Sequence, residues 1–309
     1  MTGTARPGSD ESTGFAKRLA SARATRLAYA LAMLATAISP MPARATEFAD
    51  LRAALQLDAA WAYHDHWKNP RVERSIFTFT FRGREAQVTQ LVEAEWTDVE
   101  HLVKPQDLEA VGRTPSGRAV HSMELHQLYD MPTTFGEFGA FCGVLVARDT
   151  MAPLKWDYNF YDTCGSIAKR LAANREPAVL EADGYWEGRA TYTTPSLEGV
   201  WISDGLALTL RALPLAEGYA ARVRLAITDR GRVTAPLAIA DAKIAVTTAK
   251  TAVPAGAFDT WRVAVDAKGF TALYWFERTP VRKLVAYEVG GVRYELLKQD
   301  VIDYADEER

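Results

Sequence analysis

Along most of the chain, apolar and polar side chains alternate in short runs, which is the pattern of half-buried β-strands. The sets that share one strand face are Phe77, Phe79 and Phe81; Val88, Val92, Ala94 and Trp96; Ala119, His121, Met123 and Leu125; Trp156, Tyr158 and Phe160; Leu206, Leu208 and Leu210; Tyr219, Ala221, Val223, Leu225 and Ile227; Trp261, Val263 and Val265; Leu273 and Trp275; and Val292, Tyr294 and Leu296. Glycine-containing turns separate these sets, and their short spacing favours antiparallel hairpins over βαβ crossovers.

Two segments instead predict helices. In residues 50–67 the apolar positions recur at helical spacing and Asn69-Pro70 ends the run, while residues 164–174 read as a short helix capped from Asp162 or Thr163. The predicted fold class is therefore mainly β, a β-rich α+β protein with a curved antiparallel sheet or half-barrel and one or two covering helices. We expect a β-rich region over residues 46–182 and an antiparallel region over 183–309, with a soft boundary between residues 174 and 183.

The first 45 residues predict export. Basic residues from Lys17 to Arg26 precede an apolar run over residues 27–41, and Ala43-Arg-Ala45 is a small-x-small cleavage signal. The alternative is a membrane anchor, but the run is shorter than the roughly 20 residues of a spanning helix and contains Pro40. We expect a signal peptide over residues 1–45, a mature chain that begins at Thr46, and a periplasmic or secreted protein with no membrane span after cleavage.

Charge narrows the choice of partners. Residues 1–45 hold six basic and two acidic side chains, so their removal leaves 30 basic against 37 acidic residues and a net charge near −7. An acidic chain of this kind lacks the basic surface that nucleic acids need, and an anionic membrane surface would not attract it. We therefore expect no nucleic-acid partner.

The chain has two cysteines, Cys142 and Cys164. In an oxidising compartment such a pair predicts a disulfide. Two free thiols, or small buried apolar residues, are the alternatives.

The candidate catalytic residues form no complete site in the sequence. His64, Asp65 and His66 are the most metal-like cluster, but histidines two positions apart point to different sides of a helix, and no further ligand group stands at metal-ligand spacing. Glu93 and Glu95 share a strand face, as solvated glutamates often do. Ser116 lies in a turn and forms no Gly-x-Ser-x-Gly motif. The sequence predicts no metal, no cofactor and no catalytic residue, and it leans against an enzyme.

Residues 206–298 resemble exported bacterial proteins of the domain-of-unknown-function family DUF3108. The matching motifs are Leu213-Pro-Leu215, Val253-Pro-Ala-Gly-Ala-Phe-Asp259, Trp261-Arg-Val263, Tyr274-Trp-Phe276 and Leu284-Val-Ala-Tyr287. The resemblance implies a curved half-barrel like that of periplasmic lipoprotein carriers, with a concave apolar face and no catalytic residues. Within the turn, Pro254 fixes φ and Gly256 supplies a permissive position, so we expect Gly256 at positive φ.

The aromatic side chains leave the function open between two readings. They form a closed core if the sheet closes tightly, and they line a groove for an apolar ligand if it stays open. We expect a non-enzymatic binding or carrier protein for a lipid or lipoprotein in the cell envelope. The expected ligand-binding residues are Trp261, Trp275, Leu208, Val263 and Tyr294, with both tryptophans on the concave side. The alternatives are an envelope-assembly protein that binds a protein partner along a strand edge, and a metal-dependent hydrolase that uses His64, Asp65 or His66.

Overall fold

The structure is a computed structural model, and it describes residues 56–133, 136–194 and 196–303. The predicted signal peptide lies outside the described residues. The elements are α3 (Ala59–Ala62), η1 (Asp65–Trp67), β1 (Arg71–Phe81), β2 (Arg84–Asp98), α4 (Pro105–Ala110), β3 (Ala119–Thr133), β4 (Gly136–Ala147), β5 (Pro153–Asp162), β6 (Gly165–Ala172), β7 (Ala178–Gly184), β8 (Gly188–Thr194), β9 (Val200–Ile202), η2 (Ser203–Gly205), α5 (Leu206–Thr209), η3 (Leu210–Ala212), β10 (Ala220–Ile227), β11 (Ala238–Val253), β12 (Gly256–Ala267), β13 (Phe270–Glu277), β14 (Leu284–Val289) and β15 (Val292–Asp303).

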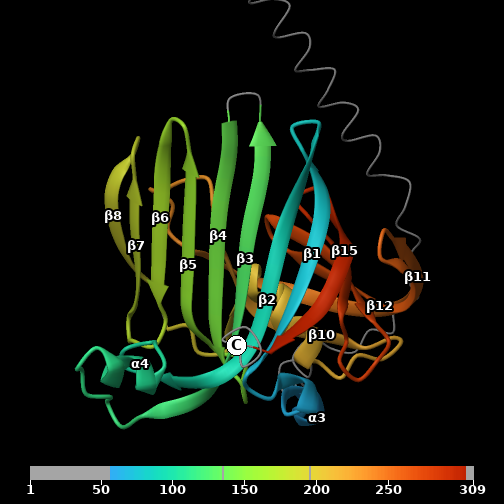
Figure 1. The fold of residues 1–309 in the computed structure, drawn as a ribbon, viewed down its shortest axis with the longest axis horizontal. Helices are drawn as coiled ribbons and strands as arrows, with labels where there is room; N and C mark the ends of the chain where they lie inside the picture. The colour runs from blue at the N-terminus through green and yellow to red at the C-terminus, as the bar shows by residue number, and fades with distance from the viewer. Residues whose placement is uncertain (1–55, 134–135, 195, 304–309) are drawn as a thin grey trace, which may run out of the picture. The chain divides into compact units, whose positions relative to one another are not determined.

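The strands form one 15-stranded sheet in the order β8-β7-β6-β5-β4-β3-β2-β1-β15-β14-β13-β12-β11-β10-β9. Nearly every strand pairs with its sequence neighbours, as expected of successive hairpins. Every pairing is antiparallel except that of β9 with β10. Figure 1 shows β8 to β1 standing side by side, with β15 next to β1 and β10 to β12 passing behind. The sheet is open, with β8 and β9 at its edges, and the predicted fold class is confirmed.

The two predicted regions are joined within this sheet. The expected boundary between residues 182 and 183 falls inside β7, which pairs with β6 and β8. At the other side, β1 pairs with β15 from Arg71–Asp303 to Thr78–Glu295, so the start and end of the described chain lie on neighbouring strands. Across this pair, the guanidinium of Arg74 donates to both carboxylate oxygens of Asp300, at 2.9 and 2.7 Å.

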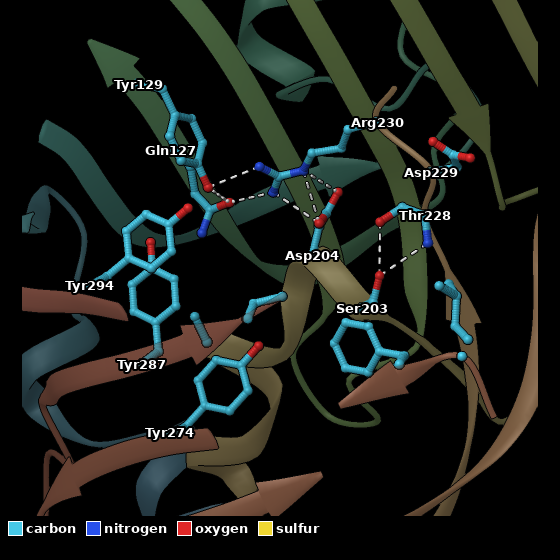
Figure 2. A pocket seen from close by; sticks show the side chains of 15 residues that line it. Gln127, Tyr129, Ser203, Asp204, Thr228, Asp229, Arg230, Tyr274, Tyr287 and Tyr294 are labelled. Carbon is cyan, nitrogen blue, oxygen red and sulfur yellow. Dashed lines mark hydrogen bonds and ion pairs between the residues drawn. The ribbon is translucent and has the colours of Figure 1, made fainter. Parts of the chain in front are cut away.

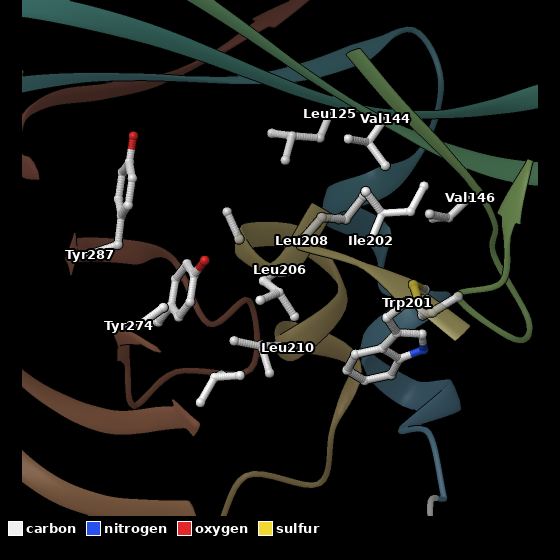
Figure 3. Packing of buried hydrophobic residues seen from close by; sticks show 14 of the residues in the cluster. Leu125, Val144, Val146, Trp201, Ile202, Leu206, Leu208, Leu210, Tyr274 and Tyr287 are labelled. Carbon is white, nitrogen blue, oxygen red and sulfur yellow. The ribbon is translucent and has the colours of Figure 1, made fainter. Parts of the chain in front are cut away.

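A central segment, residues 200–212, fills the interior of the curled sheet. It consists of β9, η2, α5 and η3, and every residue in it except Asp204 is buried. The strand predicted from Leu206, Leu208 and Leu210 is wrong, because these residues lie in α5 and η3. A run that is apolar on all sides suits a short buried helix as well as a strand, so its periodicity does not separate the two. In Figure 3 its leucines lie between Leu125 and Val144 on one side and Tyr274 and Tyr287 on the other.

The second predicted helix, residues 164–174, is also wrong. The segment forms β6, which pairs with β5 and β7. Asp162 does accept hydrogen bonds at the start of the segment, from the backbone N–H groups of Cys164 at 2.7 Å and Gly165 at 2.9 Å. These bonds close a hairpin turn and not a helix, since aspartate serves both roles with the same local hydrogen bonds. Of the first predicted helix, residues 56–67 are described, and they contain only the short α3 and η1.

A buried ion pair fastens η1 and η3 to the sheet. Arg211 donates to both oxygens of Glu73 on β1, at 2.7 and 3.0 Å, and Glu73 also lies 2.8 Å from Nε2 of His66. The Arg211 guanidinium lies over the rings of Trp67 and Trp61, at 4.8 and 5.7 Å from their centroids. Burial tends to raise the pKa of Glu73, but the charge of Arg211 and the hydrogen bonds from both partners lower it to about 2.

Candidate functional site

A pocket of about 470 Å³ lies inside the curled sheet, next to the central segment (Figure 2). We call it the tyrosine pocket. Its walls come from β3, η2, α5, the loop after β10 and strands β13 to β15, so distant parts of the chain meet there. The lining residues that carry the argument are Gln127, Tyr129, Asp204, Arg230, Tyr274, Tyr287 and Tyr294. This volume falls in the range of sites for small molecules.

Arg230 crosses one wall of the tyrosine pocket and joins its polar groups. Its Nε and Nη2 donate to the Asp204 carboxylate at 2.9–3.2 Å. Nη2 also donates to Oε1 of Gln127 at 3.0 Å, and Nη1 donates to the Tyr129 hydroxyl at 2.9 Å. Asp204 accepts a further bond from Nε1 of Trp156 at 2.9 Å, and the Cys142 thiol lies 3.5 Å from the same oxygen. The pair is thus held from several strands, which fixes its position.

Three tyrosines form a row on the opposite wall. Tyr274 on β13 is the register partner of Tyr287 on β14, which is the partner of Tyr294 on β15. Side chains of register partners lie on the same face of a sheet. The rings are accordingly stacked, with centroids 6.1 Å apart for Tyr274 and Tyr287 and 4.2 Å apart for Tyr287 and Tyr294. The hydroxyl of Tyr287, a residue only 4% exposed, has no hydrogen-bond partner among the described residues.

Burial keeps the tyrosine hydroxyls of the pocket protonated. Burial raises the pKa of Tyr274, Tyr287 and Tyr294 above the ordinary value of 10, and it raises that of Tyr158 to about 12. Burial likewise raises the pKa of the Cys142 thiol, so this cysteine is a neutral, inert group. For Arg230, burial tends to lower the pKa, but the charge of Asp204 outweighs it and the pKa stays above its usual range.

A second concavity of about 280 Å³ adjoins the first. We call it the aromatic hollow, and its apolar walls include Phe79, Phe81, Met131, Tyr158, Phe160 and Val292. It shares Tyr129, Arg230 and Tyr294 with the tyrosine pocket. The site therefore has a polar compartment and an aromatic compartment that meet at Arg230.

The structure places the expected ligand-binding residues in different environments. Tyr294 lines both compartments. Leu208 and Val263 are fully buried in the core. Trp261 faces the core side of β12, because its register partner is Phe276, whereas Trp275 pairs with Arg262 and faces the other side. The expectation that both tryptophans lie on the concave side is wrong, since residues 275 and 276 alternate in face. The Arg293 guanidinium covers the Trp275 ring at 4.6 Å.

The predicted disulfide is wrong, because Cys142 and Cys164 are both free. Cys142 is buried on β4 opposite Tyr158 of β5, while Cys164 lies in the turn after β5 ends at Asp162. Asp162 lies four residue steps beyond Tyr158 along the extended strand, or about 13 Å at 3.3 Å for each step. A disulfide needs Cα atoms within about 7 Å of each other.

The histidine and carboxylate clusters have local roles. His66 contacts Glu73, and the ring of His64 accepts a bond from the His66 backbone at 3.1 Å. Among the described residues, the one group of three possible metal ligands is Glu93, Glu95 and Glu124. The ammonium group of Lys104 lies 2.6 Å from Glu95 and 3.6 Å from Glu93, so a cation already occupies this acidic cluster.

Ser116 does not belong to a catalytic triad. Its hydroxyl donates to Asp98 at 2.8 Å, and Nδ1 of His101 lies 2.9 Å from the other oxygen of that carboxylate. The aspartate therefore stands between serine and histidine, whereas in a triad the histidine contacts the serine as its base. This cluster organises the loop before β3.

Sequence reasoning missed most of the polar site. Arg230 stands beside a glycine in a polar stretch, and Asp204 and Gln127 belong to no motif. Tyr274 and Tyr287 belong to the motifs shared with DUF3108, but only the strand register shows that they stack with Tyr294. The alternation of aromatics on β1 and β5 was a usable signal, because it places Phe79, Phe81 and Phe160 in the aromatic hollow.

The chain was compared with family models, curated proteins and solved structures. No family model matches the chain, so the resemblance to DUF3108 stays a prediction, and no curated protein matches it. A solved structure described as a beta-barrel-like protein of domain of unknown function DUF1849 from Brucella abortus matches 76% of this chain and 98% of its own, with 8% identity and a TM-score of 0.40. Within the described residues, no helix is long and apolar enough to cross a membrane.

Proposed function

We propose that the protein is an exported, periplasmic binding or carrier protein for a ligand with an apolar body, and that the ligand occupies the tyrosine pocket and the aromatic hollow. The pocket itself carries this proposal. Its volume of about 470 Å³ lies inside a large curled sheet whose other concave-side rings, such as Phe77 and Phe276, are completely packed. A cavity that persists among so many large side chains is a feature that dense packing would otherwise remove.

The closed-core reading and the groove reading each describe part of the molecule. Phe77, Trp156 and Phe276 are core residues, at most 1% exposed. Phe160 and Tyr294, in contrast, are only partly buried and border the open volume. The first group belongs to the core, and the binding proposal depends on the second group alone.

The test is native mass spectrometry of the protein purified from the periplasm of the organism that produces it. We expect an additional mass of a small apolar molecule that is lost when Tyr287 or Tyr294 is replaced by alanine. N-terminal sequencing of the same sample should read Thr46-Glu-Phe-Ala. Retention of residues 27–41 in the product would contradict export, and ligand-free spectra together with no uptake of added lipid would contradict the binding function.

A strand edge supports the protein-interaction alternative. β8 stands at one edge of the sheet order, and Tyr185 and Trp186 in the preceding turn are 69% and 74% exposed. Exposed edges can take up a strand from a partner. A stable protein adduct in the same spectrum, lost on replacement of Trp186 by serine and not of Tyr287, would favour this function.

A further inference from the structure

We propose, resting on the binding function above, that the ligand is an amphiphile with a single apolar chain and an uncharged polar head that accepts hydrogen bonds. The chain lies in the aromatic hollow and the head in the tyrosine pocket. The absence of charge on the head follows from how the polar groups of the site are paired with one another.

The two compartments differ in chemistry. The aromatic hollow has walls of phenylalanine, methionine, alanine and valine apart from the residues at its junction with the pocket and from Thr80 and Tyr158. The tyrosine pocket adds Gln127, Ser203, Asp204, Thr228 and Asp229. A wholly apolar ligand would remove water from these polar groups and would leave the Tyr287 hydroxyl without a partner, which costs free energy. A ligand with one apolar end and one polar end satisfies both compartments.

Arg230 does not make the site a receptor for anions. Its guanidinium forms a two-point ion pair with Asp204, and it also donates hydrogen bonds to Gln127 and Tyr129. The charged residues that line the two compartments, among those described, are Asp204, Asp229 and Arg230, with a combined charge of −1. An anionic head would approach two carboxylates, and a cationic head would approach the partly buried guanidinium of Arg230.

The tyrosines supply neutral donors. The Tyr287 hydroxyl is buried and lacks a partner among the described residues, although it borders the tyrosine pocket (Figure 2). A buried hydroxyl without a hydrogen bond is destabilising, and an acceptor on the ligand would relieve this cost. Because burial raises the pKa of Tyr274, Tyr287 and Tyr294, these groups remain donors throughout the physiological range. An ester carbonyl or a hydroxyl on the head is a suitable acceptor.

The test compares three ligands with the same lauroyl or dodecyl chain. Monolaurin is neutral, laurate is anionic and dodecylamine is cationic. Each is used at slightly alkaline pH to displace the uncharged fluorescent probe N-phenyl-1-naphthylamine from the mature protein. We expect monolaurin to displace the probe at a concentration at least about tenfold lower than either charged ligand, a difference of about 1.4 kcal/mol.

The variant Asp204→Asn tests the cause. It leaves the charge of Arg230 without a counterion, so the preference should shift from monolaurin towards laurate. The matched control is Asp183→Asn, which changes the net charge equally. Asp183 pairs with the exposed Arg189 and lines neither compartment, so the order of the three ligands should not change.

A third variant keeps the proposal testable if Asp204→Asn fails to fold. Tyr287→Phe removes only the hydroxyl, and it should weaken monolaurin by about three- to tenfold while probe binding is unchanged. Equal affinity of wild-type protein for monolaurin and laurate would overturn the uncharged head and leave the binding function standing. Failure of the probe and all three ligands to bind would overturn the binding function itself.

Discussion

Arg230 is a single loop residue that organises the polar groups of the tyrosine pocket. Its side chain leaves the segment after β10 and ends between Asp204 and Tyr129. A guanidinium in a partly dry site needs a compensating carboxylate, and Asp204 provides it from the central segment. Because Trp156 and Cys142 also contact Asp204, the ion pair connects β4, β5 and η2 through one carboxylate. Such a group cannot be recognised from sequence, since its partners are far apart along the chain.

Gly256 allows a quantitative test of backbone strain. Its φ of 137° confirms the positive φ expected from the sequence, and it pairs with Val253 to close the β11–β12 hairpin. An added Cβ would meet only the Phe258 ring, at 3.7 Å, so the strain is in the backbone. We expect Gly256→Ala to lower the free energy of unfolding by at least about 1 kcal/mol in denaturant titrations. Gly231→Ala, without positive φ or a close contact, is the control and should be nearly neutral.

Glu73 predicts a specific acid sensitivity. Its pKa is about 2 in the fold and ordinarily 4.5, so its stabilising effect is complete above pH 4.5 and is lost as the pH falls towards 2. Glu73→Gln should cost about 3–5 kcal/mol at neutral pH, because it leaves the Arg211 charge buried and unpaired. It should also flatten the loss of stability between these pH values, as measured by urea unfolding at several pH values.

The exposed pair of Lys68 and Asp65 is the matched control for Glu73. Their side chains are 69% and 76% exposed, and exposed pairs contribute little to stability. Asp65→Asn should leave unfolding at neutral pH almost unchanged. A Glu73→Gln variant as stable as the wild type would show that the buried pair does not hold η1 and η3 to the sheet.

At the scale of elements, the sequence was most informative where one face is buried and the other solvated. The alternation in β1, β3, β5 and β12 predicted these strands correctly, because burial on one side imposes a period of two. It failed for the central segment, where leucines are buried on every side and the period disappears. It failed again at residues 164–174, where an aspartate turn resembles a helix cap. The candidate site could not be predicted from periodicity either, because strand register and sheet curvature bring its residues together.

Leu208 tests the role of the central segment as the filling of the sheet. It is completely buried on α5. Leu208→Ala should lower the free energy of unfolding by about 2–5 kcal/mol, through lost burial and an unfilled cavity. Leu297→Ala on β15, where the side chain is 41% exposed, is the control and should cost less than about 1 kcal/mol. Equal effects in thermal and urea unfolding would contradict the packing role of α5.

At the scale of the molecule, the continuous sheet predicts one unfolding event for the described residues from β1 to β15. The two predicted regions share β7, and they meet again where β1 pairs with β15. Neither region can lose its strands without exposing the edge of the other. We expect tryptophan fluorescence and far-ultraviolet circular dichroism to give the same urea midpoint. Two separate midpoints would show that the regions are independent domains.

The pairing of β1 with β15 also orders events in time. Arg71 on β1 and Asp303 on β15 are register partners. Strand β1 therefore cannot complete its pairing until β15 has been synthesised. During synthesis, β1 presents an unpaired edge until β15 has been made. Contacts this distant in sequence also make folding slow. The protein should therefore depend on a holding chaperone until its final strand is released, and a chain cut before β15 should aggregate and not form a smaller stable fold.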